Sequence, residues 1–392
     1  MTNRAAAALL AIAGLAAASA GQQARVNGSS WVHDIWQPAA LANKTLLDIT
    51  LPGTHDSATF TLQDHFAPGS NALLEDIVRL ADKLGINAYP LVIAWATAQN
   101  ITLKQQLDAG ARFIDLRACW SEPSEADPSA PTGWHTFHMV LGLPIAELLD
   151  QIAAFLDEAP GGEVVVVEVT HLLGSNATTQ AQLRALLEAK LGDHLVRGMQ
   201  FNATLQALTQ GATKSRVLVL LEDWDGDGSS TGLWPDALIR GEYANQDNVP
   251  KMAEWDQGLI ETLGGTGHIF RLWWTLTENV DDIVAGVLDP SKYPTKLFDL
   301  VRLANAQLAG WAAANRNYTL GNLLVVDDFE NSPALEIAVA DALRNCLDDP
   351  QLRARSPSGD DCRSWGIAGD CAASGSHGDF VRAHCRRTCL QC

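Results

Sequence analysis

Val164-Val165-Val166-Val167 and Val217-Leu218-Val219-Leu220-Leu221 are the two stretches of sequence that decide the fold. Each is a continuous apolar run, a pattern typical of a parallel strand that is covered on both faces. Working outward from them, we predict further strands at five other short runs of the chain. These are Leu46–Leu51, Arg112–Arg117, Trp134–Val140, His268–Trp273 and Leu323–Val326.

Longer amphipathic patterns separate the predicted strands. After Pro144, apolar side chains recur at helical spacing, and a proline suits the first turn of a helix. The apolar residues of this pattern are Ile145, Leu148, Leu149, Ile152 and Phe155. Alternation of strands and helices favours a β/α barrel over a β-sandwich, with a doubly wound open sheet as the alternative.

The composition excludes several classes of function. Of the 392 residues, 47% are hydrophobic and 19% are charged, a balance typical of a globular protein rather than a disordered one. The chain has 27 lysines and arginines against 46 aspartates and glutamates, which gives a formal net charge of −19. So acidic a chain lacks the basic surface that nucleic acid or an anionic membrane attracts.

The first 20 residues are typical of a secretory signal peptide. Arg4 supplies the positive start, Ala5–Ala18 the apolar segment, and Ala18-Ser19-Ala20 a small-residue cleavage site. An uncleaved anchor or a buried helix is the alternative, but the run is short for a membrane span. We therefore expect a secreted, extracellular protein, and also a glycoprotein, because Asn-x-Ser/Thr acceptor sites occur at Asn27, Asn43, Asn100, Asn176, Asn202 and Asn317.

Six of the seven cysteines lie in the segment 346–392. Cysteines this dense indicate a small module held together by disulfides, because so short a segment buries little apolar surface. A zinc site would need paired Cys-x-x-Cys knuckles, and only Cys389 and Cys392 form one. We therefore divide the chain into a signal peptide at 1–20, a barrel domain at 21–343 and a disulfide module at 346–392.

The tail resembles the ShK toxin-like (ShKT) domain. The resemblance rests on Cys362-Arg-Ser-Trp365, Gly369-Asp-Cys371, Phe380 and the final Cys385-x-x-x-Cys389-x-x-Cys392. It implies an extracellular binding partner of unknown identity for the module. It also implies three disulfide pairs, Cys346–Cys392, Cys362–Cys385 and Cys371–Cys389.

Polar residues end most of the predicted strands of the large domain. Active sites of β/α barrels lie at the carboxyl ends of the strands, so we expect these side chains to meet at one rim. Buried ionisable groups are costly unless they are paired or used in chemistry. Along the chain they are His55 and Asp56, Asp115 and Arg117, His138, Thr170 and His171, Glu222 and Asp223, and Asp327 and Asp328.

Such a set suits the cleavage of a phosphodiester. That reaction needs a base, an acid and a cation that holds the phosphate. Two histidines can be the base and the acid because their pKa lies near neutrality. An arginine binds phosphate oxygens through its planar fork, and a carboxylate can orient a histidine.

Ordered blocks of the large domain resemble the X domain of phosphatidylinositol-specific phospholipase C. They are Leu51–Phe60 with the motif Pro52-Gly53-Thr54-His55-Asp56-Ser57, then Ile101–Arg117, then Phe155-Leu156 before Glu163-Val164-Val165, and last Asp328-Phe329. The resemblance implies a distorted, TIM-like β/α barrel. It also implies an enzyme that cleaves a phosphodiester in phosphatidylinositol or a related phospholipid head group.

The resemblance assigns roles on the base side of this reaction. His55 would be the general base, and Asp328 would orient it. Arg117 would bind the phosphate, and Asp115 would hold Arg117 in place. Because this arginine stands where other members bind calcium, we expect no metal and no cofactor. The acidic run Asp223–Asp227 keeps calcium open as the minority alternative.

On the acid side, His138 would be the general acid and Asp56 would assist it. The family has a glycine after this histidine, whereas Met139 follows it here. His135 is the competing candidate, but in an extended strand it points to the opposite face from His138. The expected catalytic residues are thus His55, Asp56, Asp115, Arg117, His138 and Asp328.

Substrate recognition departs from the bacterial pattern, in which basic residues at the fourth and fifth strand ends contact the head group. Here His171 and Glu222 take these places. We expect both to contact the substrate.

Two other functions stay open. One is a non-catalytic lipid- or glycan-binding protein on a degenerate barrel, which Met139 favours. The other is a metal-dependent phosphodiesterase of the glycerophosphodiesterase or sphingomyelinase D type. The presence of Arg117 speaks against the second, because that type clusters carboxylate ligands around its histidines.

Overall fold

The computed structural model describes residues 27–36, 41–69, 72–264, 266–315 and 320–343. The predicted signal peptide at 1–20 and the predicted module at 346–392, with its three disulfide pairs, lie outside the described residues. No helix in the described ranges is long and apolar enough to cross a membrane.

Parallel strands form a curled sheet in the order β7-β6-β5-β2-β1-β10-β9-β8. An antiparallel hairpin of β3 and β4 extends from the end of β2. The strands are β1 (Leu51–Thr54), β2 (Phe113–Ser121), β3 (Gly133–His138), β4 (Val140–Pro144), β5 (Val164–Leu173), β6 (Arg216–Leu221), β7 (Leu233–Pro235), β8 (Ile239–Arg240), β9 (Ile269–Trp274) and β10 (Leu323–Val326).

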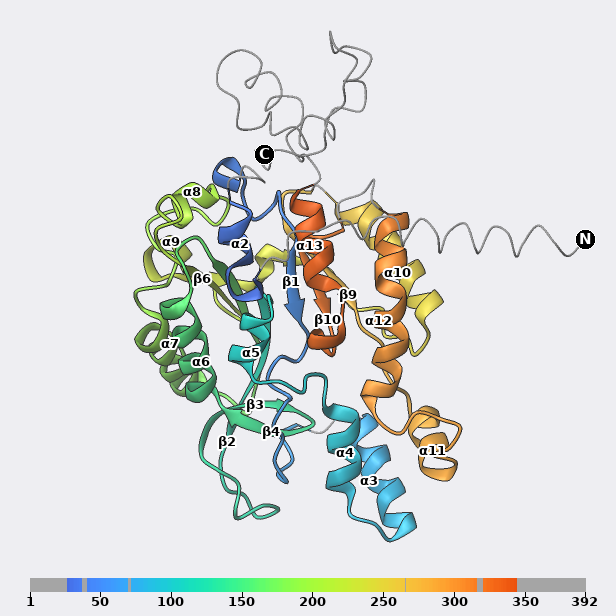
Figure 1. Ribbon diagram of the computed structural model, residues 1–392. Helices are drawn as coiled ribbons and strands as arrows, with labels where there is room; N and C mark the ends of the chain where they lie inside the picture. The colour runs from blue at the N-terminus through green and yellow to red at the C-terminus, as the bar shows by residue number, and fades with distance from the viewer. Residues whose placement is uncertain (1–26, 37–40, 70–71, 265, 316–319, 344–392) are drawn as a thin grey trace, which may run out of the picture.

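Helices surround this sheet, and the fold is the predicted distorted β/α barrel (Figure 1). The helices are α2 (Trp31–Asp34), α3 (Ala72–Leu84), α4 (Ala88–Ala96), α5 (Leu103–Asp108), α6 (Ile145–Glu158), α7 (Ala177–Leu191), α8 (Leu205–Leu208), α9 (Gly228–Thr231), α10 (Val249–Leu263), α11 (Val280–Leu288), α12 (Leu297–Ala314) and α13 (Ala334–Ala342). Short 3-10 turns lie at Gly28–Ser30, Leu41–Asn43, Asp236–Leu238 and Phe329–Asn331.

Local sequence explains where several elements begin. Helix α6 starts directly after Pro144, as predicted, and buries its apolar stripe. Helix α5 begins with a capping box in which Thr102 and Gln105 satisfy each other's backbone N–H groups. The predicted strand Trp134–Val140 is instead two strands, because Met139 takes the left-handed conformation and reverses the chain.

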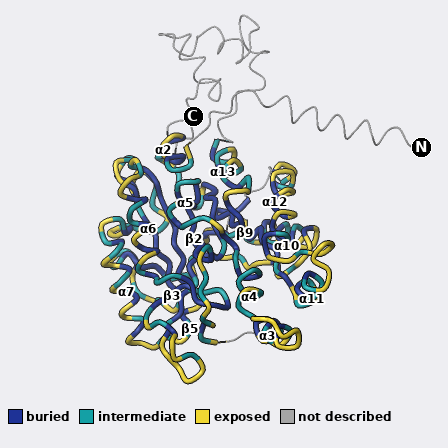
Figure 2. Tube along the Cα trace, turned by 60° about the horizontal axis from the view of Figure 1, so that its bottom comes forward, coloured by how far each residue is buried: buried dark blue, intermediate teal, exposed yellow. Residues whose placement is uncertain are grey.

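Apolar side chains fill the interior of the barrel. Phe113, Val166, Leu218 and Leu323 belong to one buried cluster that closes the barrel beneath the strand ends. At Gly53 on β1, a Cβ would lie 2.7 Å from the Cβ of Phe113, so only glycine leaves room for this ring. Figure 2 shows the buried trace gathered centrally and the exposed trace around it.

One ion pair is fully buried near the start of β2, away from the rim. The guanidinium of Arg112 lies 2.7 Å from Glu163, and both side chains are 0% exposed. Arg112 also donates to the backbone carbonyls of Leu107, Ala111 and Gly28. This pair therefore ties the amino-terminal turn to the bottom of the barrel.

Backbone strain gathers at the carboxyl ends of the strands. Asp56, Met139, His171, Asp223 and Asp328 all have φ between 43° and 73°, which is unusual for residues with a side chain. Asp56, Met139, Asp223 and Asp328 lie just after the end of a strand, and His171 lies among the last residues of β5 (Val164–Leu173). Such strain is typical of sites where side chains must be aimed in a fixed direction.

Candidate active site

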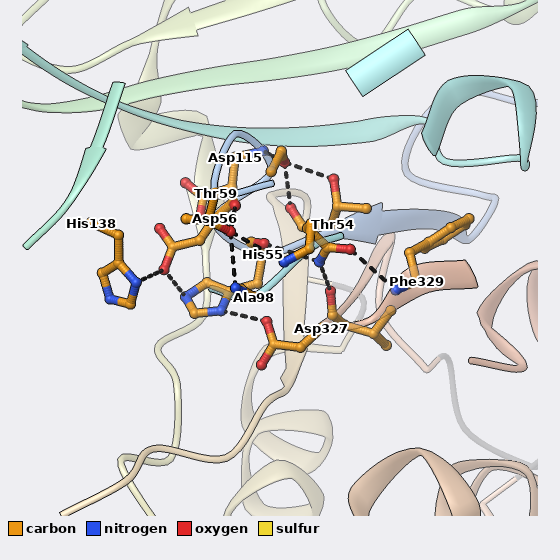
Figure 3. Close-up of polar contacts among 12 residues, drawn as sticks. Thr54, His55, Asp56, Thr59, Ala98, Asp115, His138, Asp327 and Phe329 are labelled. Atoms are coloured by element: carbon orange, nitrogen blue, oxygen red, sulfur yellow. Dashed lines mark hydrogen bonds and ion pairs between the residues drawn. The ribbon is translucent and has the colours of Figure 1, made fainter. Parts of the chain in front are cut away.

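His55 follows β1 and lies against a carboxylate from the neighbouring strand β10. Its Nδ1 is 2.8 Å from Oδ1 of Asp327, which is 1% exposed (Figure 3). Strands β1 and β10 pair in parallel, so their carboxyl ends meet. A carboxylate at Nδ1 fixes the orientation of the ring and leaves Nε2 facing the rest of the site.

The expectation that Asp328 orients His55 is wrong by one residue. The Asp328 Oδ1 accepts a hydrogen bond from Asn331 Nδ2 at 2.9 Å, and the Asp328 backbone N–H donates to Ala98. Consecutive side chains of a strand point to opposite faces. Leu323 and Val325 face the barrel interior, so Asp327 is the residue in phase with them.

Asp56 is the centre of the cluster. Its carboxylate is 3.2 Å from His55 Nε2, 2.7 Å from Arg117 Nε and 3.4 Å from His138 Nδ1. Burial alone would raise the pKa of Asp56, but the charges of Arg117, His138 and His55 outweigh it and lower this pKa to about 2. The carboxylate is therefore ionised and balances the charges around it.

Arg117 reaches the cluster from β2. Its Nη2 lies 2.8 Å from His55 Nε2, and its Nε lies 3.8 Å from Asp115 Oδ2. Asp115, two residues earlier on the same strand, also accepts a hydrogen bond from the Asp56 backbone N–H at 3.0 Å. The side chain of Arg117 is 18% exposed, so part of the guanidinium faces the opening of the barrel.

His138 enters from the end of β3. Its Nδ1 is 2.7 Å from the carbonyl oxygen of Ala96 at the end of α4. A carbonyl only accepts, so Nδ1 carries a proton and Nε2 is left for another partner. The rings of His55 and His138 have centroids 6.5 Å apart. His135 instead lies near the carbonyl of Gly142, on the other face of the strand.

The two histidines have pKa values shifted in opposite directions. Burial lowers the pKa of His55, but Asp56 and Asp327 outweigh this and raise it to about 9. Burial also lowers the pKa of His138, and the attraction of Asp56 does not compensate. The contact with Arg117 Nη2 fits a neutral Nε2 on His55, while the two carboxylates favour its protonated form.

The two predicted substrate contacts lie together at the rim. His171 is exposed, with its Nδ1 2.9 Å from Thr170 Oγ1 and its ring 6.0 Å from that of Phe137. Burial and the charge of Arg117 lower the pKa of His171. Glu222 is half-buried and accepts a hydrogen bond from the His171 backbone, and burial raises its pKa.

Sequence reasoning missed four residues near this cluster. Trp273, at the end of a predicted strand, has its ring 5.2 Å from that of His55 at an interplanar angle of 82°. Glu168, which is buried, forms an ion pair with the partly buried Arg271, and burial raises the pKa of Glu168 to about 7 against the effect of Arg271. Burial likewise raises the pKa of Glu278 to about 7. Strand alternation could have revealed Arg271, because it lies two residues before Trp273 on β9 and faces the same side. Glu168 on β5 lies beside Asp115 on β2 and faces the same side as that residue.

Among the residues that the structure describes, His55, Asp56 and Asp115 form a group that could offer atoms to a metal ion. Their ligand atoms lie within 4.8 Å of one another. However, Arg117 contacts all three of these residues, so its guanidinium already supplies a cation at this place. In the acidic run considered for calcium, Asp227 instead caps α9 and accepts from the N–H and Oγ of Ser229.

Comparisons with known proteins show which proteins this chain is similar to in sequence. No family model matches the chain. PI-PLC X domain-containing protein 2 of Mus musculus is 24% identical over 305 residues, which span 78% of this chain and 84% of that protein. PI-PLC X domain-containing protein 1 of Homo sapiens is 26% identical, over 74% and 87% of the two chains. The variant-surface-glycoprotein phospholipase C of Trypanosoma cruzi is 23% identical, over 72% and 76%.

Solved structures give the same result for the fold. The phosphatidylinositol-specific phospholipase C of Listeria monocytogenes superposes with a TM-score of 0.55 at 16% identity, covering 81% of this chain and 99% of that one. The corresponding enzyme of S. aureus gives 0.53 at 17% identity, covering 81% and 97%. The chain thus has the TIM-like barrel fold of the bacterial phosphatidylinositol-specific phospholipases C, and in sequence it is similar to PI-PLC X domain proteins.

Proposed function

We propose that this protein is a phosphodiesterase of the phospholipase C type, acting on phosphatidylinositol or a related phospholipid head group. The observation that carries the proposal is the continuous cluster Asp327–His55–Asp56–His138, with Arg117 against His55 and Asp56, where the strands end. A protein that only binds lipid has no need of two oriented histidines joined by a carboxylate, with a guanidinium beside them. The predicted signal peptide suits secretion, which we include in the proposal.

In the proposed reaction, His55 begins the chemistry. Its Nε2 takes the proton from a hydroxyl of the head group next to the phosphate, while Asp327 accepts a hydrogen bond from Nδ1–H. The hydroxyl oxygen attacks phosphorus, and Arg117 turns from His55 to a phosphate oxygen and offsets the developing charge. Such an internal attack yields a cyclic phosphate.

His138 completes the reaction on the other side of the phosphorus. Its Nε2–H protonates the glyceride oxygen as the bond from this oxygen to phosphorus breaks. The hydrogen bond to Ala96 holds the ring so that Nε2 points away from α4. The two rings have centroids 6.5 Å apart, and in-line displacement needs the phosphorus to lie between the base and the acid.

The proposed enzyme needs no metal ion. Arg117 provides the positive charge at the position where His55, Asp56 and Asp115 could otherwise bind a cation. The cationic fork contacts these groups directly, and a bound divalent ion would have to displace it. Calcium binding therefore remains only the minority alternative.

A direct test compares the wild-type protein and His55→Ala on phosphatidylinositol, glycosyl-phosphatidylinositol and sphingomyelin vesicles. We expect the wild type to cleave one of the inositol lipids and the variant to lose roughly 10³-fold or more in kcat, because base and acid act as a unit. Binding to vesicles without turnover by the wild type would instead support the lipid-binding alternative.

A further inference from the structure

A second polar group crosses the barrel directly below the candidate active site. Arg271 on β9 donates through Nη1 to Glu168 on β5, and the sheet places β2, β1 and β10 between these two strands. The side chains are 17% and 5% exposed. Apolar side chains such as Leu218 and Val325 line the interior around them.

Arg271 is also stacked on Trp273. Its Cζ lies 4.4 Å from the centroid of the Trp273 ring. The carbonyl oxygen of Gly241 accepts from Arg271 Nη2 at 3.2 Å and from Trp273 Nε1 at 3.3 Å. One carbonyl and one guanidinium thus fix both the position and the tilt of the indole.

The fixed indole in turn contacts the imidazole of His55. The two rings meet edge to face, with centroids 5.2 Å apart. Asp327 holds Nδ1 of His55, and in the proposed reaction Arg117 leaves Nε2 for the phosphate, so the ring gains freedom to rock about the Asp327 hydrogen bond. A rigid wall at Trp273 removes this freedom.

We propose that Glu168, Arg271 and the Gly241 carbonyl form a clamp that holds Trp273 against His55 and thereby positions the imidazole for proton transfer. The Trp273 clamp, as we name these three groups, acts through Trp273, so Glu168 and Arg271 are positioning residues. The inference rests on the proposed function in assigning proton transfer to His55.

The chemistry of the pair supports this role over a purely structural one. A buried ion pair is often no more stabilising than apolar side chains of the same size, because both charges lose their hydration. What apolar side chains cannot provide is a planar cation that stacks on an indole and also donates to fixed acceptors. At Gly241 a Cβ would lie 2.0 Å from the backbone oxygen of Arg271. Only glycine therefore lets the backbone at position 241, with its carbonyl, come so close to β9.

The test replaces the ion pair by apolar side chains in the double variant Glu168→Met/Arg271→Met. We expect kcat to fall about 10-fold with KM unchanged within about twofold, because a small misplacement of a catalytic group is costly to the rate. Arg271→Lys should not restore kcat, since an ammonium lacks the planar stack. In ¹⁵N NMR spectra the ring signals of His55 and their titration should shift in both variants.

Trp273→Leu tells whether the clamp acts through the indole. This variant should lose about as much kcat as the double variant, and adding the double change to it should cost less than about a further twofold. Independent, additive losses would overturn the proposal. The proposal would also be overturned if Glu168→Met/Arg271→Met kept both the kcat and the His55 NMR signals of the wild type.

The buried pair Arg112–Glu163 provides the matched control. Arg112→Met/Glu163→Met leaves three backbone carbonyls without their donor and should lower the melting temperature, but it should leave the kcat of the folded protein and the His55 signals unchanged. If the double variant at the clamp does not fold, Glu168→Gln takes its place with the same readouts. An active His55→Ala would refute the proposed function alone, because the NMR signals of His55 test the clamp without any turnover.

Discussion

At the scale of single residues, the sequence predicted which side chains gather at the strand ends but not every contact between them. His55, Asp56, Arg117 and His138 come together as their positions at predicted strand ends suggested. Asp327 was missed in favour of its neighbour, because a motif does not show which of two adjacent aspartates faces inward. Strand alternation, counted back from the apolar run Leu323–Val326, decides it.

The pKa shifts define an unusual active protonation state. In the proposed mechanism His55, the base, must be neutral although its pKa is raised to about 9, and His138, the acid, must be charged although its pKa is lowered. This combination is a minor state between the two pKa values. A plot of kcat/KM against pH is then bell-shaped. Its fall on the alkaline side, the alkaline limb, reports the group with the higher pKa, which here is His55.

Asp327→Asn should move this alkaline limb to lower pH. The carboxylate of Asp327 raises the pKa of His55, so its loss lowers that pKa. We also expect kcat to fall roughly 10²-fold, because the imidazole loses its orienting partner. The measurement is a pH profile of kcat/KM, with Asp328→Asn as the neighbouring control. An alkaline limb that stays in place in Asp327→Asn, or moves equally in Asp328→Asn, would contradict this assignment.

Activity should survive chelation. Arg117 lies against all three residues that could bind a cation, so EDTA should change kcat less than about twofold and added calcium should restore nothing. Arg117→Lys keeps the charge but loses the fork that reaches His55 and Asp56 together, and it should lower kcat at least about 10²-fold. Loss of wild-type activity in EDTA, with recovery in calcium, would show that a metal is required.

At the scale of elements, the spacing of apolar residues predicted correctly whether a segment is a helix or a strand, but it placed the ends of these elements poorly. The apolar runs at Val164 and Val217 are central parallel strands, and α6 follows Pro144 as predicted. The first strand begins at Leu51 rather than Leu46. The predicted third strand is a hairpin, because hydrophobic patterns carry no information about a residue with positive φ at Met139.

Met139→Gly tests how the hairpin presents His138. Glycine takes φ near +62° without strain, which recovers about 1–2 kcal/mol. The buried methionine side chain is lost, however, at a cost of about 2–5 kcal/mol. We expect urea unfolding to show a net destabilisation of about 1–3 kcal/mol, with kcat within about threefold of wild type. Met139→Val, which disfavours this φ, should lose both stability and activity. A folded but inactive Met139→Gly would mean that the side chain itself takes part in the reaction.

At the scale of the whole molecule, one buried acid opposes the stability of the barrel. Asp256 on α10 is 0% exposed, and neither carboxylate oxygen has a hydrogen-bond partner in the described part of the chain. Burial raises its pKa to about 8. The folded state therefore keeps a proton between about pH 4 and pH 8 that the unfolded state has released, so stability falls as pH rises through this window.

Asp256→Asn should remove this pH dependence. We expect the free energy of unfolding to increase by about 1–4 kcal/mol at pH 7 and to change little at about pH 3, where both states of the wild type are mostly protonated. Denaturant unfolding at the two pH values measures the difference. Glu254→Gln, an exposed carboxylate on the same helix, is the control and should change neither value. An equal gain at both pH values would show that Asp256 is not protonated in the folded protein.

The central claim is that His55 and His138 cleave a phosphodiester by internal attack. The most direct measurement is ³¹P NMR of phosphatidylinositol vesicles incubated with the wild-type protein, His55→Ala or His138→Ala. We predict a cyclic inositol phosphate signal with the wild type and a signal at least about 10³-fold slower to form with His55→Ala. No phosphorus product with the wild type, or the same rate with His55→Ala, would contradict the account.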